Sequence, residues 1–273
     1  YISVTGVQTC ALPILLAAPL DLGALTDAFA DRMETDTRIE PDARGKVRAV
    51  RQMRLGALVL EERQLDTVPR ELITQALLGE VRRQGLSALP WGERAETLRA
   101  RLAFLRRFDE AWPDVSDEAL TARLQEWLEP LVEGRTALGQ ITDADLERAV
   151  ADLIPWDLRR RLDAEAPERF EAPTGSRLRI DYGAEGGPRV DVRVQELFGL
   201  GTHPTVAGGR VALTLSLLSP AHRPVQLTKD LPGFWKGSWA AVRSEMRGRY
   251  PKHPWPEDPA NAAPTTRAKP RGT

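Results

Sequence analysis

Cysteine and histidine are scarce in this chain of 273 residues. Cys10 is the single cysteine, so an intramolecular disulfide and a cysteine-based metal site are both excluded. The three histidines, His203, His222 and His253, show no spacing typical of metal ligands, and we expect no metal site. No apolar run is long enough to span a bilayer, so we expect a soluble, cytoplasmic protein without a membrane partner.

The motifs of common catalytic sites are also missing. The sequence contains no G-x-x-x-x-G-K-[ST] phosphate-binding loop, no Asp-Glu-x-His motif and no G-x-S-x-G nucleophile turn. Gly199–Gly201 and Gly208–Gly209 predict turns, because a dinucleotide site would need a third glycine and a following helix. No pair of acidic residues stands out as buried and opposed. We therefore assign no catalytic residue and no cofactor site to these residues.

Positive charge and tryptophan gather at the C-terminal end. The net charge is −1, yet residues 219–273 hold ten Lys and Arg against four Asp and Glu, together with Trp235, Trp239 and Trp255. Bases stack on aromatic rings and phosphates pair with cations, so this composition favours a single-stranded nucleic-acid partner. The alternative is a tryptophan-anchored helix that packs on its own domain. The candidate nucleic-acid-binding residues are Arg223, Lys229, Trp235, Lys236, Arg243, Arg247, Arg249, Tyr250 and Lys252.

The first fourteen residues differ in character from the rest. Val4–Ile14 resembles the translation of a common sequencing-library adapter, and no initiator Met starts the chain. We therefore exclude residues 1–14 from the fold and expect a C-terminal fragment of a longer protein. A genuine strand-like N-terminus is the alternative, whereas the lack of a basic start argues against a signal peptide.

Hydrophobic periodicity predicts strands followed by helices in the next part. Residues 15–30 predict a helix with Asp21 or Thr26 as its cap, and residues 37–65 predict strands with a turn at Arg44–Gly45. The five basic residues from Arg44 to Arg54 suit a phosphate-facing strand or a solvated sheet face. Further helices are predicted from Pro69 to Gly85, Trp91 to Leu105, Ser116 to Leu131, Thr142 to Leu153 and Pro155 to Ala166. Gly85 is the expected C-cap of the first of these helices and Ser116 the expected N-cap of the third. We expect the Leu and Trp stripes of this helical segment to lie in the core.

A period of two returns after Pro173. Residues 177–182 and 189–194 alternate apolar with charged side chains around a glycine-rich segment, which predicts a β-hairpin. Its polar face carries four Arg and two Asp, as cross-strand ion pairs or as a basic binding face. We predict strands at 211–218 and 225–228, a helix capped by Asp230 through Arg247, and disorder past Pro259. The fold class is therefore α+β.

Several segments resemble the C-terminal region of HrpB-type ATP-dependent helicases, a branch of the DEAH-box group. The resemblance is strongest over Ser219–Gln226 and Met246–Pro259 and is also clear over Gly175–Tyr182 and Val194–Leu200. With the segments of weaker similarity included, the resemblance covers nearly the whole chain after residue 15. The resemblance implies a β-rich, OB-like segment at 15–66, a helical block at 67–135, a small mixed β-hairpin and helix domain at 136–260, and a disordered tail at 261–273.

In this family, two RecA-like motor domains bind and hydrolyse ATP with Mg²⁺, and they lie N-terminal to the region that this chain resembles. The resemblance thus implies an accessory region that binds single strands, RNA in first place, or braces the motor domains. No catalytic residue is carried over, and we expect no ATP hydrolysis by this chain alone. A purely structural module without nucleic-acid contact is the alternative, and either RNA or DNA fits the composition.

Overall fold

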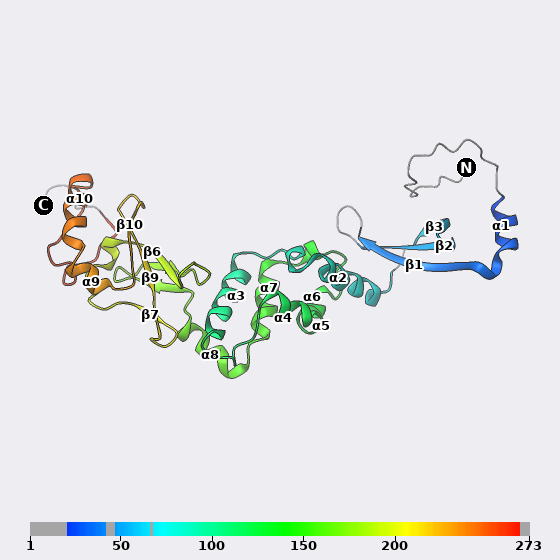
Figure 1. Ribbon diagram of the computed structural model, residues 1–273, viewed down its shortest axis with the longest axis horizontal. Helices are drawn as coiled ribbons and strands as arrows, with labels where there is room; N and C mark the ends of the chain where they lie inside the picture. Colours follow the sequence, from blue (N-terminus) through cyan, green and yellow to red (C-terminus); the bar gives the residue numbers. More distant parts are fainter. Residues whose placement is uncertain (1–20, 42–46, 66–67, 268–273) are drawn as a thin grey trace. The chain divides into compact units, whose positions relative to one another are not determined.

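The computed structural model describes residues 21–41, 47–65 and 68–267 (Figure 1). The chain folds into two compact units, and each draws on two stretches of sequence. Unit 1 comprises residues 1–90 and 123–142, and unit 2 comprises residues 91–122 and 143–273, within the described ranges. Both units contain helices and both contain strands, which confirms the α+β class. The predicted domain boundaries stay a prediction, although the one at 135/136 lies inside unit 1.

An antiparallel sheet forms the first part of unit 1. β1 (Met33–Pro41), β2 (Val47–Leu55) and β3 (Leu58–Gln64) pair in this order. The β-prone run from residue 46 to 60 divides at Gly56, whose φ of 58° is left-handed and suits glycine. Within the described residues, the segment predicted to be OB-like is thus a three-stranded sheet. The adapter-like residues 1–14 and the predicted turn at Arg44–Gly45 lie outside the described residues.

The helix predicted before this sheet is present in shorter form. α1 (Leu22–Ala28) is followed by the 3-10 turn η1 (Ala30–Arg32). The Asp21 carboxylate accepts the backbone N–H of Gly23 at 2.7 Å, so Asp21 is the N-cap. Thr26, the other predicted cap, lies inside the helix, where its hydroxyl donates to the carbonyl of Leu22.

Helix α2 (Arg70–Gln84) buries Leu77, Leu78 and Val81 in unit 1. It ends at Gly85, whose φ of 83° confirms the predicted cap. The helix predicted from Ser116 to Leu131 is interrupted at Arg123 and again at Leu128, and only the second break adjoins Pro130, which lacks the N–H that a continuous helix needs. The remaining elements of unit 1 are η2 (Leu86–Ala88), α5 (Leu124–Trp127), α6 (Glu129–Val132) and η3 (Leu138–Gln140).

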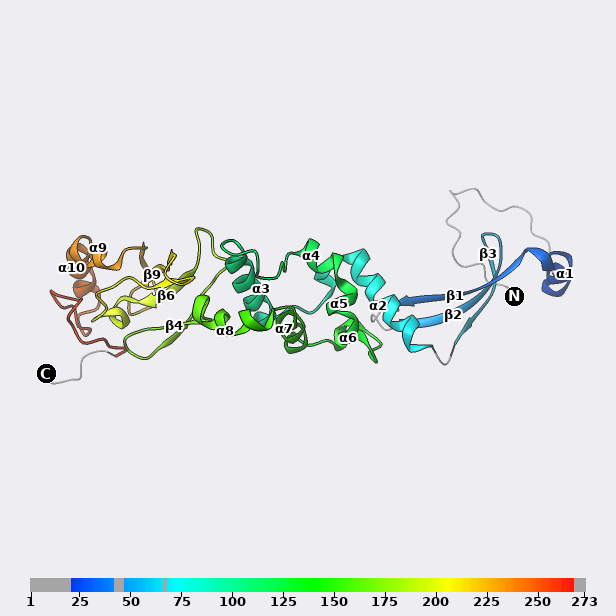
Figure 2. The same cartoon turned by 90° about the horizontal axis from the view of Figure 1, so that it is seen from below.

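Unit 2 begins with a pair of packed helices, α3 (Glu93–Arg106) and α7 (Asp143–Asp152), which lie side by side (Figure 2). Leu102 and Leu105 of α3 and Leu146 and Val150 of α7 are fully buried in its core. The other helices of this part are α4 (Asp117–Ala122), where the Ser116 hydroxyl caps Ala119 at 3.3 Å, and α8 (Trp156–Glu165).

The predicted hairpin of residues 177–194 is wrong in its pairing. β6 (Arg189–Arg193) runs parallel to β9 (Thr214–Leu218). The two segments that were predicted to pair, residues 177–182 and 189–194, are paired only by an isolated antiparallel bridge between Asp181 and Arg189. The alternating pattern buries Val190 and Val192 in either pairing, so it could not identify the neighbour. The full set of pairs in unit 2 is β10 (Pro224–Thr228) on β9, β9 on β6, β4 (Arg169–Glu171) on β5 (Arg177–Arg179), and β7 (Thr205–Val206) on β8 (Val211–Ala212).

The helix predicted from Asp230 to Arg247 is divided in two. Asp230 caps α9 (Leu231–Lys236) by accepting the N–H of Gly233 at 2.9 Å, as predicted. The chain then leaves helical geometry at Gly237 (φ −102°, ψ −91°) and resumes as α10 (Trp239–Arg249). A 3-10 turn, η4 (Val194–Leu197), follows β6.

The tail predicted to be disordered from residue 261 is placed as far as residue 267. The N–H of Thr265 donates to the carbonyl of Gln195 at 3.0 Å, and Ala262 lies against Gly199. These backbone contacts, which composition does not encode, join residues 262–265 to residues 195–199, and disorder of the tail stays a prediction. Residues 268–273 lie outside the described residues.

Candidate nucleic-acid interface

Five aromatic residues, which we call the aromatic cluster, form the core of the C-terminal part of unit 2. The ring centroids of Trp235 and Trp239 lie 5.4 Å apart, edge to face, and those of Trp239 and Trp255 lie 6.1 Å apart. Phe198 and Phe234 complete the cluster, with centroids 5.7 Å and 6.2 Å from that of Trp239. Edge-to-face contacts of this kind stabilise a core beyond the area they bury.

Each tryptophan of this cluster donates its indole N–H to a backbone carbonyl. The acceptors are Leu200 for Trp235 at 3.0 Å, Pro256 for Trp239 at 3.0 Å, and Tyr250 for Trp255 at 2.9 Å. Trp235 is only 8% exposed, which favours the packing alternative for its ring. Packing accounts for the contacts of all three tryptophans, and the assignment of Trp235 to nucleic-acid binding stays a prediction.

Arg243 and Tyr250 also have structural partners. The Arg243 guanidinium donates to the carbonyl of Trp255 at 2.9 Å and pairs with Glu257 at 2.9 Å. These two contacts tie α10 to the segment that follows it, and the assignment of Arg243 as a strand-binding cation stays a prediction. Tyr250 is half-buried, its hydroxyl lies 3.4 Å from that of Ser219, and its carbonyl accepts the Trp255 indole.

The other six candidates are exposed cations. Lys229 donates to the carbonyl of Gly186 at 2.8 Å, and Arg249 pairs with Glu245 at 3.1 Å. The remaining four side chains form no ion pair within the described part of the chain, and we call them the free cations. The free cations are Arg223, Lys236, Arg247 and Lys252.

The cations of α10 do not share one face of the helix. Arg247 and Arg249 are two residues apart, which is about 200° around a helix with 3.6 residues per turn. Trp239 and Met246 form the buried stripe between them. The structure thus spreads the predicted basic residues around the C-terminal region and does not bring them into one compact patch.

Comparison with known proteins decides the family. Residues 127–259 match a family model, HrpB_C, described as the C-terminal part of ATP-dependent helicases. Over residues 127–259 the chain is thus similar to the C-terminal domain of HrpB-type helicases. It is 43% identical over 261 residues to the ATP-dependent RNA helicase HrpB of Escherichia coli strain K12, which is 94% of this chain and 32% of that protein.

Two crystal structures of E. coli HrpB share the fold of the HrpB-type chain. One, of the DExH-box NTPase HrpB, matches with a TM-score of 0.70 at 43% identity and covers 93% of this chain and 32% of that one. The other, of the DEAH/RHA helicase HrpB, matches with a TM-score of 0.61 at 41% identity and covers 82% and 29%. The chain therefore spans about a third of the length of these relatives.

A buried carboxylate, that of Glu196, lies in η4, two residues before Phe198 of the aromatic cluster. Glu196 is buried and accepts hydrogen bonds from the Arg193 guanidinium at 2.8 Å and the Thr174 hydroxyl at 3.3 Å. Burial alone would raise the pKa of Glu196, but bonds from Ser176, Arg193 and Thr174 outweigh it and lower the pKa. The carboxylate is thus held ionised, and this arrangement stabilises the fold without providing a proton donor.

Metal ligation and membrane insertion find no support in the part of the chain that is described. None of its His, Cys, Asp or Glu residues gather in a group of three or more that could bind a metal ion. Among the described helices, none is both long and apolar enough to cross a bilayer.

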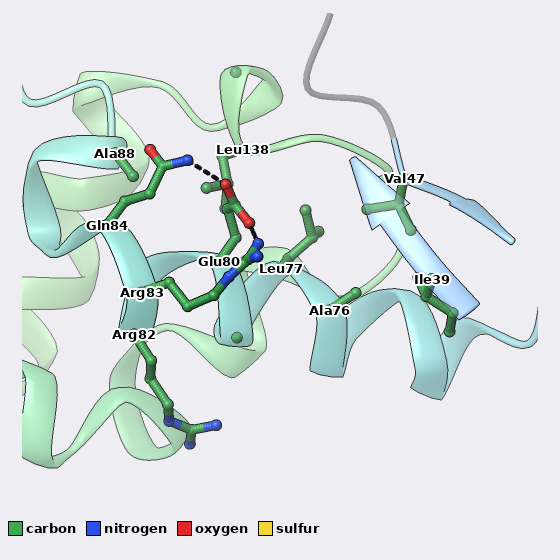
Figure 3. A pocket seen from close by; sticks show the side chains of 12 residues that line it. Ile39, Val47, Ala76, Leu77, Glu80, Arg82, Arg83, Gln84, Ala88 and Leu138 are labelled. Atoms are coloured by element: carbon green, nitrogen blue, oxygen red, sulfur yellow. Dashed lines mark hydrogen bonds and ion pairs between the residues drawn. The ribbon is translucent and has the colours of Figure 1, made fainter. Parts of the chain in front are cut away.

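Unit 1 contains a groove of about 610 Å³ between α2, the ends of β1 and β2, and η3 (Figure 3). Its floor is apolar, and Glu80 on its rim pairs with Arg83 and accepts a hydrogen bond from Gln84 (Figure 3). A charge-paired rim over an apolar floor suits packing of an apolar side chain better than catalysis. The apolar floor consists of Ile39, Val47, Ala76, Leu77 and Leu138.

Trp156 is a large exposed aromatic residue that was not among the predicted site residues. We expected tryptophans of the helical segment to lie in the core, yet Trp156 is 72% exposed at the start of α8. The signal was available in the helical period, because Leu158 and Leu162 mark the buried stripe and Trp156 lies about 200° from Leu158.

Proposed function

We propose that this chain is the part of an HrpB-type helicase that binds single-stranded nucleic acid, with RNA as the first strand to consider. The observation that carries the proposal is the set of free cations at the surface of the C-terminal region. Cations without acidic partners attract phosphates, and a bound strand gains further free energy from the counterions it releases. The E. coli relative is named an RNA helicase, which favours RNA over DNA.

ATP hydrolysis belongs, in this proposal, to RecA-like motor domains elsewhere in such a helicase, which bind ATP and Mg²⁺. This chain then acts with the motor domains as an accessory region in the cytoplasm. The lack of a phosphate-binding loop in its sequence supports that division of roles.

Fluorescence anisotropy with a 5′-fluorescein-labelled U20 RNA tests strand binding. We expect binding at micromolar protein that weakens strongly between low and moderate salt. Replacing Arg247, Arg249 and Lys252 together by Ala should reduce the affinity and lower the magnitude of the salt slope by up to about three, because each lost phosphate contact removes about one. The matched control replaces Arg70, Arg94 and Arg148, exposed arginines of the helices α2, α3 and α7, by Ala.

The outcome separates the proposal from its main competitor. If the unaltered chain gives no anisotropy change at micromolar concentration, the strand-binding proposal is wrong. If both triple variants lose affinity equally, Arg247, Arg249 and Lys252 do not form a strand-binding site. ATP turnover by the chain alone, stimulated by RNA, would contradict the division of roles.

Bracing of the motor domains is the second candidate function. Leu58 and Val59 of β3 are exposed apolar side chains in unit 1, and exposed apolar residues at a sheet edge favour a protein contact. This function predicts no strand binding, so the same anisotropy measurement tests it.

A further inference from the structure

Trp156 is unusual among the seven tryptophans of the chain. Five others are less than a tenth exposed and Trp91 is half-buried, whereas Trp156 is 72% exposed. It occupies the first residue of the ten-residue helix α8, directly after the N-cap Pro155. A ring that is this exposed and held on a rigid element is pre-organised for a ligand.

Arg160 lies one helical turn further along and covers the same ring. Its guanidinium carbon is 5.1 Å from the centroid of the Trp156 ring. The neighbouring arginines have acidic partners, since Arg159 pairs with Asp152 at 3.2 Å and Arg161 with Glu165 at 2.7 Å. Arg160 is exposed and forms no ion pair with any described residue, so its charge is available to an anion.

We propose that Trp156 and Arg160 form a stacking platform for an unpaired base of a single strand, with Arg160 contacting the adjacent phosphate. This inference rests on the proposed strand-binding function and adds to it a site on α8 that lies outside the predicted basic tail. Aromatic rings and guanidinium groups both stack on bases, and the charge of Arg160 complements the backbone.

The surroundings of Trp156 favour a base over a protein partner. A protein contact needs a contiguous apolar patch of several hundred Å². The adjoining Asp157, Arg159 and Arg160 are all exposed and charged. Phe108, another exposed aromatic residue of unit 2, is covered by Arg210, which pairs with Glu165 at the opposite end of α8, about 13 Å along the helix from Trp156.

Anisotropy titrations of fluorescein-labelled U20 and dT20 with the full chain test this platform. Trp156→Ala should weaken binding about 5- to 100-fold, the range expected for one lost stacking contact, while Trp156→Phe should stay within about threefold. Arg160→Ala should weaken binding and lower the magnitude of the salt slope by about one. Leu227→Ala, which removes an exposed apolar side chain of β10, is the control and should change nothing.

Two outcomes separate this inference from the function on which it rests. If the unaltered chain binds strands and Trp156→Ala binds equally well, the platform is wrong, the strand-binding function stands, and Trp156 serves a protein contact instead. If the unaltered chain binds neither strand, both are overturned. Iodide quenching gives a second readout, since bound U20 should protect the quenchable fluorescence that Trp156→Ala removes; unchanged quenching on binding would also overturn the platform.

Discussion

The carboxylate of Asp143 accepts the backbone N–H of Gly92, 51 residues earlier in the chain, at 3.0 Å. It also accepts the N–H groups of Arg94 and Ala95, each at 3.0 Å. Gly92 occupies the N-cap position of α3 but has no side chain that could accept hydrogen bonds. The side chain of Asp143, the first residue of α7, therefore caps α3 in its place. One side chain thus joins two helices that hydrophobic packing already holds together.

Replacing Asp143 by Ala should lower the free energy of unfolding by about 1–2 kcal/mol, the usual effect of a lost helix cap. Urea denaturation followed by circular dichroism measures it. The control is Asp157→Ala, which removes an exposed acid from the first turn of α8. Equal stability of the Asp143 variant and the unaltered chain would contradict the capping role.

The contribution of Asp143 to the free energy of unfolding should depend on pH. Burial pushes the pKa of Asp143 upward, but the three backbone hydrogen bonds outweigh it and lower the pKa. A lowered pKa means that the stabilisation is complete above the unfolded-state value near 4 and is lost as the pH falls below it. The stability difference between the unaltered chain and Asp143→Asn should shrink when urea titrations move from pH 6 to pH 3.

Gly92 should not tolerate a larger residue. A Cβ atom at this position would lie 2.6 Å from the Asp143 Cγ, which three hydrogen bonds hold in place. We expect Gly92→Ala to cost about 1–3 kcal/mol, as for other overpacked sites. Gly79→Ala is the matched control because no atom lies within 4 Å of its Cβ, and inside α2 it should stabilise by about 0.5–1 kcal/mol. Thermal melting of both variants should therefore give shifts of opposite sign.

His203 should make the chain less stable in mild acid. Its Nδ1 accepts the N–H of Leu231 at 3.0 Å, so the proton of the neutral ring lies on Nε2 and is donated to the carbonyl of Leu213 at 2.8 Å. Burial lowers the pKa of His203, and the stability it provides is therefore present above about pH 6.5 and lost as the pH falls further.

Urea unfolding at pH 7.5 and 5.5 measures this loss, which His203→Gln should reduce. Burial also lowers the pKa of His253, so His253→Gln is measured alongside. If the pH dependence of stability persists in His203→Gln and disappears in His253→Gln, it arises from His253, and the prediction for His203 is wrong.

Trp239 should be the most sensitive position of the aromatic cluster. It contacts Phe198, Phe234, Trp235 and Trp255 and is almost fully buried. Trp239→Ala should cost about 3–5 kcal/mol, because it removes a large core side chain and leaves a cavity. Near-ultraviolet circular dichroism and thermal melting would show it, and a change under 1 kcal/mol would contradict the assignment of this residue to the core.

Local chemistry made several elements predictable from sequence. Asp21, Ser116 and Asp230 cap helices as expected, and Gly85 ends α2, because each effect acts within a few residues of the chain. The alternation of residues 189–194 correctly predicted which valines are buried, but the parallel partner β9 lies more than twenty residues away. Nothing in a local period of two identifies a partner at that distance.

The candidate site was predicted less well than the fold. Lys and Arg in residues 219–252 were expected on the surface, and most of them are exposed. Composition could not show that Trp235 is buried and Arg243 half-buried, because their hydrogen-bond partners, the carbonyls of Leu200 and Trp255, are placed by the fold. The Leu and Trp stripes of the helical segment were expected in the core, and Trp156 is exposed because it lies on the opposite side of α8 from Leu158.

The cap that joins α7 to α3 has a consequence for biosynthesis. Asp143 is translated after all of α3 and α4, so the first turn of α3 lacks its side-chain cap until α7 is being made. A chain truncated before Asp143 therefore contains an uncapped α3, and unit 2 can reach its final stability only after the ribosome has passed α7.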